Sequence, residues 1–76
     1  MKELLETIAK ALVNQPDAVN VTQIDKEDGQ IVFELCVAEE DMGKVIGKQG
    51  RIAKAIRAVM KSAAIRENKM VSVDIV

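Results

Sequence analysis

The stretch VIGKQGRIAKAI, residues 45–56, places two glycines three positions apart, directly before a run of residues that favours a helix. Glycine adopts positive φ without a steric penalty, and it has no Cβ to hold a ligand away from the main chain. The start of a helix offers unpaired N–H groups and the positive end of the helix dipole, which both favour anions. The stretch therefore predicts a turn that can approach a phosphate group, with Lys48 supplying positive charge. The alternative is that the glycines only cap a tight turn between two helices.

The neighbouring segments predict helices and strands in a definite order. Apolar residues recur at helical spacing in residues 2–14, which end before Pro16, and in residues 51–66. A short helix is expected from Glu39 to Ile46, with Gly47 ending it. Strands are expected at residues 19–24, 31–38 and 70–76, where β-branched or alternating residues occur, and Gly29 lies in the turn between the first two.

This order of elements predicts an α+β fold, α-β-β-α-α-β, with a three-stranded mixed sheet and three helices packed on one face. With 76 residues, the chain is expected to form one domain over residues 1–76. No apolar run approaches the ~20 residues that a membrane span needs. The first residues carry Glu3 and Glu6 where a signal peptide would be basic and then apolar. A cytoplasmic protein without a membrane span is therefore expected.

The composition argues against several kinds of chemistry. Phe33 is the one aromatic residue, so stacking of bases on an aromatic platform is not expected. The chain has no His, the commonest metal ligand and general base, and Cys36 lies within a predicted strand, where a buried small apolar side chain is the usual role. We therefore expect no catalytic residues, no metal site and no cofactor.

Charge is distributed very unevenly along the chain. Residues 1–43 hold three Lys against ten Asp and Glu, a net charge of −7, whereas residues 44–76 hold eight Lys and Arg against two acids, a net charge of +6. This division suggests one face that attracts a polyanion. The alternative is a solvated surface on which opposite charges happen to be separated.

Two nucleotide-binding motifs are excluded by spacing. Three residues separate Gly43 from Gly47, whereas a Walker loop needs four, and Gln49 follows Lys48 where Ser or Thr is required. The same spacing excludes the G-x-G-x-x-G of dinucleotide-binding folds.

V-I-G-x-x-G followed by a periodic apolar helix resembles the KH domain, and the order of elements resembles its type II topology. The likeness covers the whole chain and is strongest across VAEEDMGKVIGKQGRIAKAIR, residues 37–57, where the chain resembles the small bacterial proteins that consist of a single KH domain. The resemblance implies a non-catalytic protein in which Gly47, Lys48, Gln49 and Gly50 clamp about four nucleotides of single-stranded RNA. It also implies a homodimer, or a heterodimer with a larger KH protein, acting as an RNA chaperone or post-transcriptional regulator.

The resemblance also implies a groove for the bases. Leu35 to Val37 of the second strand would form one wall, and the other would consist of apolar residues on both sides of the glycines: Val45, Ile46, Ile52, Ala53 and Ile56. The cations expected near the bound strand, besides Lys48, are Lys44, Arg51, Lys54 and Arg57. Ile46 and Ile56 are also candidates for the core, and packing is the favoured role of both. Ala53 stands where many KH domains have a bulky aliphatic residue, which implies a shallow groove. The alternative function is a dimerisation module that binds RNA only incidentally.

Overall fold

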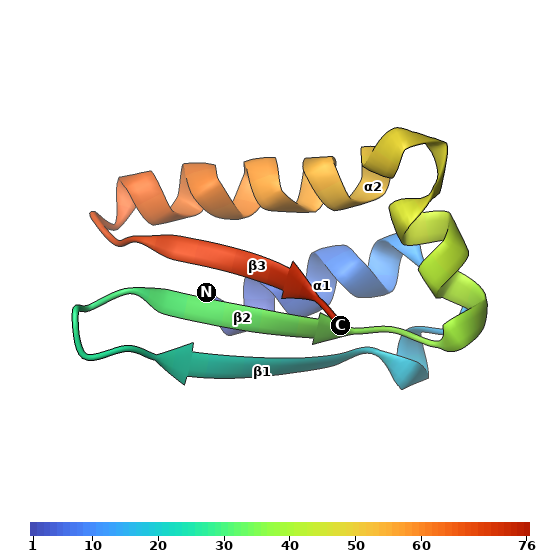
Figure 1. Ribbon diagram of the computed structural model, residues 1–76, viewed down its shortest axis with the longest axis horizontal. Helices are drawn as coiled ribbons and strands as arrows, with labels where there is room; N and C mark the ends of the chain where they lie inside the picture. The colour runs from blue at the N-terminus through green and yellow to red at the C-terminus, as the bar shows by residue number, and fades with distance from the viewer.

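Three strands form a mixed sheet in the order β1-β2-β3 in the computed structural model, which describes all residues apart from the side chain of Lys48 (Figure 1). β1 (Asn20–Asp25) pairs antiparallel with β2 (Ile31–Cys36), and β3 (Val71–Ile75) pairs parallel with the other edge of β2. Gly29 has a φ of 89° in the turn between β1 and β2. The predicted hairpin and the mixed sheet are both confirmed, and β2 is the central strand.

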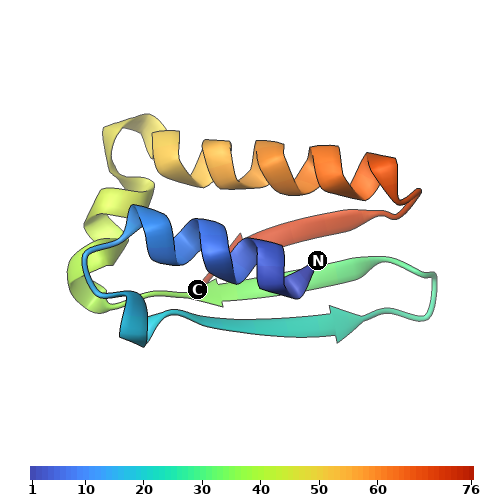
Figure 2. The same cartoon turned by 180° about the vertical axis from the view of Figure 1, so that it is seen from behind.

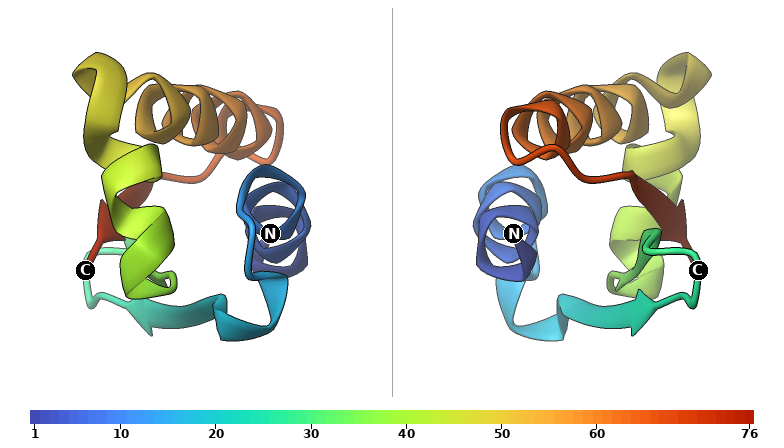
Figure 3. Two further views of the ribbon diagram at one scale, coloured as in Figure 1. Left: turned by 90° about the vertical axis from the view of Figure 1, so that its right-hand side faces the viewer. Right: turned by 90° about the vertical axis from the view of Figure 1, so that its left-hand side faces the viewer.

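The helices cover one face of this sheet, as predicted. α1 (Lys2–Leu12) is followed by a short 3-10 helix, η1 (Pro16–Ala18), and the long helical element α2 (Glu39–Arg66) connects β2 to β3. Figures 2 and 3 show α1 and α2 side by side on the same side of the sheet. Phe33 and Leu35 of β2 point into this layer and are fully buried in one apolar cluster with residues of both helices. Burial of these side chains is what holds the two layers together.

The bend in α2 lies in the second half of the predicted G-x-x-G turn. A straight helix of 28 residues would be roughly 42 Å long, which exceeds the longest dimension of the molecule, 35 Å. The backbone turns at Gln49 and Gly50, whose φ angles are 63° and 70°, and Figure 1 shows the ribbon changing direction there. The expectation that Gly47 ends the helix is wrong, because its φ is not positive and helical structure continues through it.

A buried carboxylate holds the first turn of α2 in place. Asp41 is 1% exposed, and its two oxygens accept hydrogen bonds from the backbone N–H groups of Asn14 and Gln15, each at 3.0 Å. These donors lie in the segment between α1 and η1. Each oxygen thus satisfies a distant main-chain donor, which fixes the direction of the segment of α2 that leads to the bend.

The end of α2 is closed by a Schellman motif. Lys69 donates its N–H to the carbonyl of Ala64 at 2.8 Å, and Asn68, with a φ of 56°, donates to Ile65 at 3.1 Å. This pattern satisfies carbonyls that the end of a helix leaves without partners and turns the chain into β3. Within the part of the chain that the structure describes, no helix combines the length and the apolar character needed to cross a membrane.

Candidate nucleic-acid interface

A small hollow lies beside the bend of α2. It has a volume of about 160 Å³ and is lined by Gly43, Lys44, Gly47, Arg51 and Ile52, which come from both sides of the bend. The turn at Gln49 and Gly50 brings these two helical segments together. Two cations and two glycines therefore surround one concave surface, an arrangement that favours an anion close to the main chain.

The two glycines of the G-x-x-G stretch differ in whether the backbone conformation requires glycine. Gly50 has positive φ, so any side chain there would be strained. Gly47 does not, and a Cβ placed on it would meet no atom within 4 Å. Neither backbone conformation nor packing in this structure requires glycine at position 47. The remaining physical reason is that an absent side chain leaves the main chain open to a ligand.

Most residues expected at the interface are accessible. Ile46 is 55% exposed, so its assignment to the core is wrong, whereas Ile56 is 1% exposed and lies in the core. The side chain of Lys48 lies outside the described part of the structure. The other accessible residues of the predicted site are half-buried or exposed: Lys44, Gly47, Gln49, Gly50, Arg51, Ile52, Lys54 and Arg57.

Two predicted wall residues are instead part of the core. Val45 is 0% and Ala53 is 3% exposed, and both belong to the central apolar cluster. Their side chains cannot contact a bound strand in this conformation and instead support the interface from beneath. This correction removes the argument that Ala53 makes the groove shallow.

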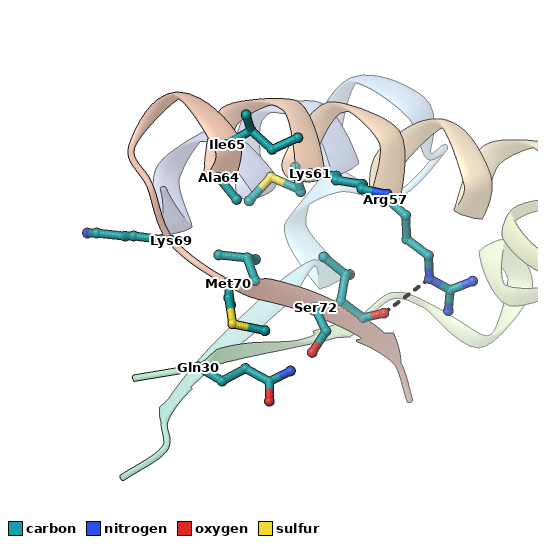
Figure 4. Close-up of a pocket in the computed structure, with 11 residues that line it drawn as sticks. Gln30, Arg57, Lys61, Ala64, Ile65, Lys69, Met70 and Ser72 are labelled. Carbon is teal, nitrogen blue, oxygen red and sulfur yellow. Dashed lines mark hydrogen bonds between the residues drawn. The ribbon is translucent and has the colours of Figure 1, made fainter. Parts of the chain in front are cut away.

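A second, larger cavity lies between α2 and β3 (Figure 4). Its volume is about 410 Å³; apolar side chains form much of the lining and three cations contribute to it, the full set being Gln30, Arg57, Met60, Lys61, Ala64, Ile65, Lys69, Met70, Val71, Ser72 and Val73. The prediction that β2 forms a groove wall is wrong, because β2 is central and Leu35 and Val37 are buried. The edge strand β3 takes that place.

The order of the elements in the sequence already indicates that β3, and not β2, borders the groove. The hairpin already occupies one edge of β2, and a strand that returns after a helical crossover can pair with the other edge. β2 then has no free edge to form a groove. No comparable local signal indicated that Gly43 lines the hollow or that Lys61, Lys69 and Met70 line the cavity, because these contacts depend on how α2 crosses the sheet.

Basic side chains line both the hollow and the cavity, whereas two acidic residues of the sheet lie on its outer face. Lys44 and Arg51 line the hollow, and Arg57, Lys61 and Lys69 line the cavity. In the sheet, Glu34 pairs in register with Asp74, and both alternate with residues that point into the core, so they lie on the outer face. The hollow and the cavity each therefore bring two or more basic side chains together.

The other chemically notable groups do not assemble into a site. Among the described residues, no group of three or more His, Cys, Asp or Glu side chains is arranged to hold a metal ion. Cys36 is exposed at the end of β2, so the expectation of a buried role for it is wrong. Its side chain lies on the outer face because it alternates with Leu35, which points into the core.

Comparison with known proteins gives consistent matches over the full chain. Residues 2–75 match the family described as KhpA/KhpB, KH domain. The RNA-binding protein KhpA of Clostridium acetobutylicum is 64% identical over 76 residues, which cover 100% of both chains. Its namesake in Clostridium perfringens is 62% identical, again over 100% of both chains. The RNA-binding protein KhpA of Listeria monocytogenes is 42% identical over 100% of this chain and 99% of its own.

Proposed function

This chain belongs to the KhpA/KhpB KH-domain family, and we propose that it binds single-stranded RNA, without catalysis, at the bend of α2 and in the groove between α2 and β3. The observation that carries the proposal is Gly47, an accessible glycine beside two cations that neither φ nor packing requires. The name of its relatives, RNA-binding protein, supports the same function.

The backbone of the RNA lies against the bend. Successive N–H groups around a left-handed residue form a concave site for an anion, and Gln49 and Gly50 supply that conformation. Lys44 and Arg51 stand beside this site and neutralise phosphates, together with Lys48. Gly47, Lys48, Gln49 and Gly50 thus clamp a segment of about four nucleotides, the length that KH domains hold.

The bases continue along α2 toward the larger cavity. Lys54 and Arg57 follow Arg51 at helical spacing, so the cations extend from the bend toward the wall that faces β3. The apolar lining of the cavity, with the exposed side chains of Ile65 and Met70, suits the faces of bases. The strand is therefore held by phosphate contacts at one end and by apolar contacts at the other.

This mode of binding predicts weak and salt-dependent affinity. Phosphate contacts without extensive base recognition give dissociation constants of roughly 10⁻⁴ to 10⁻⁶ M near physiological salt. With about four phosphates neutralised, log K falls with log salt at a slope of roughly −3 for a single strand. A titration of one labelled RNA at several salt concentrations measures this slope.

The decisive experiment is the double variant Lys48→Asp with Gln49→Asp, titrated with a fluorescent eight-nucleotide RNA in an anisotropy assay. Both carboxylates would stand at the phosphate clamp, so binding at about 0.1 M salt should disappear while the circular dichroism spectrum is unchanged. The matched control, Lys2→Asp with Thr7→Asp, makes the same change of charge on α1, which contributes to neither hollow. Wild-type affinity in the Lys48/Gln49 variant would disprove the proposed clamp.

A second candidate function is favoured by one exposed stripe of small and apolar residues. Val59 is 43% exposed and lies with the exposed residues Ala55, Ala58 and Ser62 on the side of α2 opposite the core. We propose that this stripe joins two copies of the chain, or one copy and a larger KhpB-like protein. In the cytoplasm, such pairs would act as an RNA chaperone or post-transcriptional regulator, because two linked sites hold RNA better than one.

Sedimentation separates this candidate from RNA binding. Val59→Asp should convert a dimer to a monomer, because it places a charge in an apolar contact. RNA affinity should then fall through loss of avidity, while the intrinsic affinity of each monomer remains. A protein that is dimeric in sedimentation but never shifts labelled RNA would instead be an interaction module.

A further inference from the structure

Arg57 bridges the groove between α2 and the edge of the sheet. Its Nε donates a hydrogen bond to the carbonyl oxygen of Val73 in β3, at 3.1 Å (Figure 4). This carbonyl belongs to the outer edge of the sheet. Ile31 donates to Met70 and Val76 donates to Leu35, so in this parallel pair the main chain of residues 72 and 74 faces β2 and that of Val73 faces away.

This hydrogen bond turns a flexible side chain into a fixed one. A guanidinium group is planar and carries five N–H donors, and the bond to Val73 fixes its plane through Nε. Among the hydrogen bonds of the described residues, Arg57 makes this one alone, so the donors on its two terminal nitrogens remain for a ligand. Because the acceptor is a neutral carbonyl, the positive charge is not cancelled by a carboxylate.

The cavity offers no aromatic side chain for recognising a base. Phe33 is 1% exposed in the core, and the lining consists of aliphatic, small and polar residues. In Figure 4, Arg57 lies at one end of the cavity and Lys69 at the other. An aliphatic surface accepts the face of any base, so discrimination between bases has to come from polar groups that contact the edges of the bases. Arg57 is such a group, because it holds a pair of donors in a fixed direction.

We propose that Arg57 determines which bases the groove prefers, and that it selects bases with two neighbouring acceptor atoms. This inference rests on the proposed RNA binding and assigns its specificity. Guanine presents N7 and O6 side by side, and cytosine presents O2 and N3. Adenine places its 6-amino donor next to both N1 and N7, and uracil separates its two oxygens by an N–H. A fixed pair of guanidinium donors therefore matches guanine or cytosine and mismatches adenine and uracil.

The test uses four labelled RNAs of sequence UUUXXUUU, where both X positions are A, C, G or U. The wild-type protein should bind the G or the C oligonucleotide about tenfold more tightly than the A and U oligonucleotides, the scale that a bidentate pair gives. Whichever of G and C is preferred identifies the edge that is read. Equal affinity for all four RNAs would overturn the inference while leaving the proposed function intact, whereas failure to bind any of them would overturn both.

Arg57→Lys is the informative variant, because it keeps the charge and loses the planar pair of donors. It should bind the U oligonucleotide within about twofold of the wild type and lose the preference for G or C. Lys61→Gln, in the same cavity, is the matched comparison. It removes one charge and should weaken binding to all four RNAs equally, with the preference retained.

A measurement on the wild-type protein gives an independent check. In NMR spectra that observe arginine side chains, the preferred oligonucleotide should shift the Arg57 N–H signals, and the A oligonucleotide at equal saturation should leave them nearly unchanged. Persistence of the preference in Arg57→Lys, or equal shifts with both RNAs, would show that Arg57 contributes only charge.

Discussion

Two left-handed residues of similar conformation occur in and after α2, and they have different consequences. Asn68, with a φ of 56°, ends the helix, and the carbonyls freed there are taken up by the N–H groups of the same turn. Gln49, with a φ of 63°, lies within the element and is followed by Gly50, also left-handed, with open space where a side chain would be. At Asn68 the main-chain groups of the turn bond to one another, whereas at Gln49 and Gly50 the main chain stays accessible.

The choice of residue sharpens this difference. A non-glycine residue in the left-handed region costs roughly 1–2 kcal/mol, and asparagine tolerates it best because its short side chain can bond locally. Gln49 has no such advantage. Strain that neither local bonding nor packing explains is concentrated where proteins bind ligands. At the bend, and not at the end of α2, a strained backbone therefore accompanies an accessible main chain.

The largest effect should come from valine at each turn. Gly50→Val and Asn68→Val each place a β-branched residue at positive φ, which should lower the free energy of unfolding by about 2 kcal/mol in urea titrations. Affinity for RNA should fall about tenfold only for Gly50→Val, because its side chain blocks a charge-assisted bond from the main chain to phosphate. Equal loss of affinity in the two folded variants would contradict the distinction between the turns.

The first turn of α2 differs from both of these turns, because the side chain of Asp41 holds it in place. Asp41→Asn replaces one acceptor oxygen by an NH2 group that faces a backbone N–H, which should lower the free energy of unfolding by about 2 kcal/mol. Glu40→Gln is the matched control, since Glu40 accepts an exposed hydrogen bond from Gln15, and it should cost less than about 0.5 kcal/mol. A similar decrease in the free energy of unfolding in both variants would mean that the buried hydrogen bonds of Asp41 stabilise the protein no more than an exposed one.

Gly47→Ala tests whether glycine is needed there by the fold or by a ligand. Alanine in a helix is favoured over glycine by roughly 0.5–1 kcal/mol, and its Cβ would meet no atom, so the variant should be more stable than the wild type. Affinity for RNA should fall about fivefold, since the Cβ holds the phosphate away from the main chain. Stability and affinity that fall together would point to a structural role instead.

Glycine at the two left-handed positions should give the smallest effects. Gln49→Gly should stabilise the protein by about 0.5 kcal/mol, which raises the melting temperature by about 3 °C in a domain of this size. Asn68→Gly should gain only a few tenths of a kcal/mol, because asparagine already tolerates this conformation. A larger gain in stability from Asn68→Gly than from Gln49→Gly would contradict the claim that Gln49 is the more strained residue.

Much of this protein could be predicted because it depends on neighbours in the chain. The hairpin at Gly29, the alternating strand predicted at residues 31–38 and observed over Ile31–Cys36, and the amphipathic helix after Gly50 follow from local periodicity and turn chemistry, and all three were confirmed. The G-x-x-G stretch and its surroundings also identified the KH family, which the full-length matches confirmed. The predicted contact residues remain a proposal.

What failed depended on contacts between distant segments. Ile46 and Val45 are neighbours in the chain, yet one is exposed and the other buried, and which is which depends on how the first part of α2 lies against the core. The same holds for Ala53, which was assigned to the groove and lies beneath it. Helical spacing identifies a face, but it does not say what that face meets.

The sequence by itself determined the order of the elements, the family and the basic stretch around two glycines, because each of these features depends on residues that are close together in the chain. Only the tertiary structure decided that β3 and not β2 borders the groove, that Asp41 is bonded to Asn14 and Gln15, and that Arg57 reaches Val73. The physical reason is that pairing across a sheet and packing of a helix against it join residues far apart in the chain, where local pattern carries no information on distance.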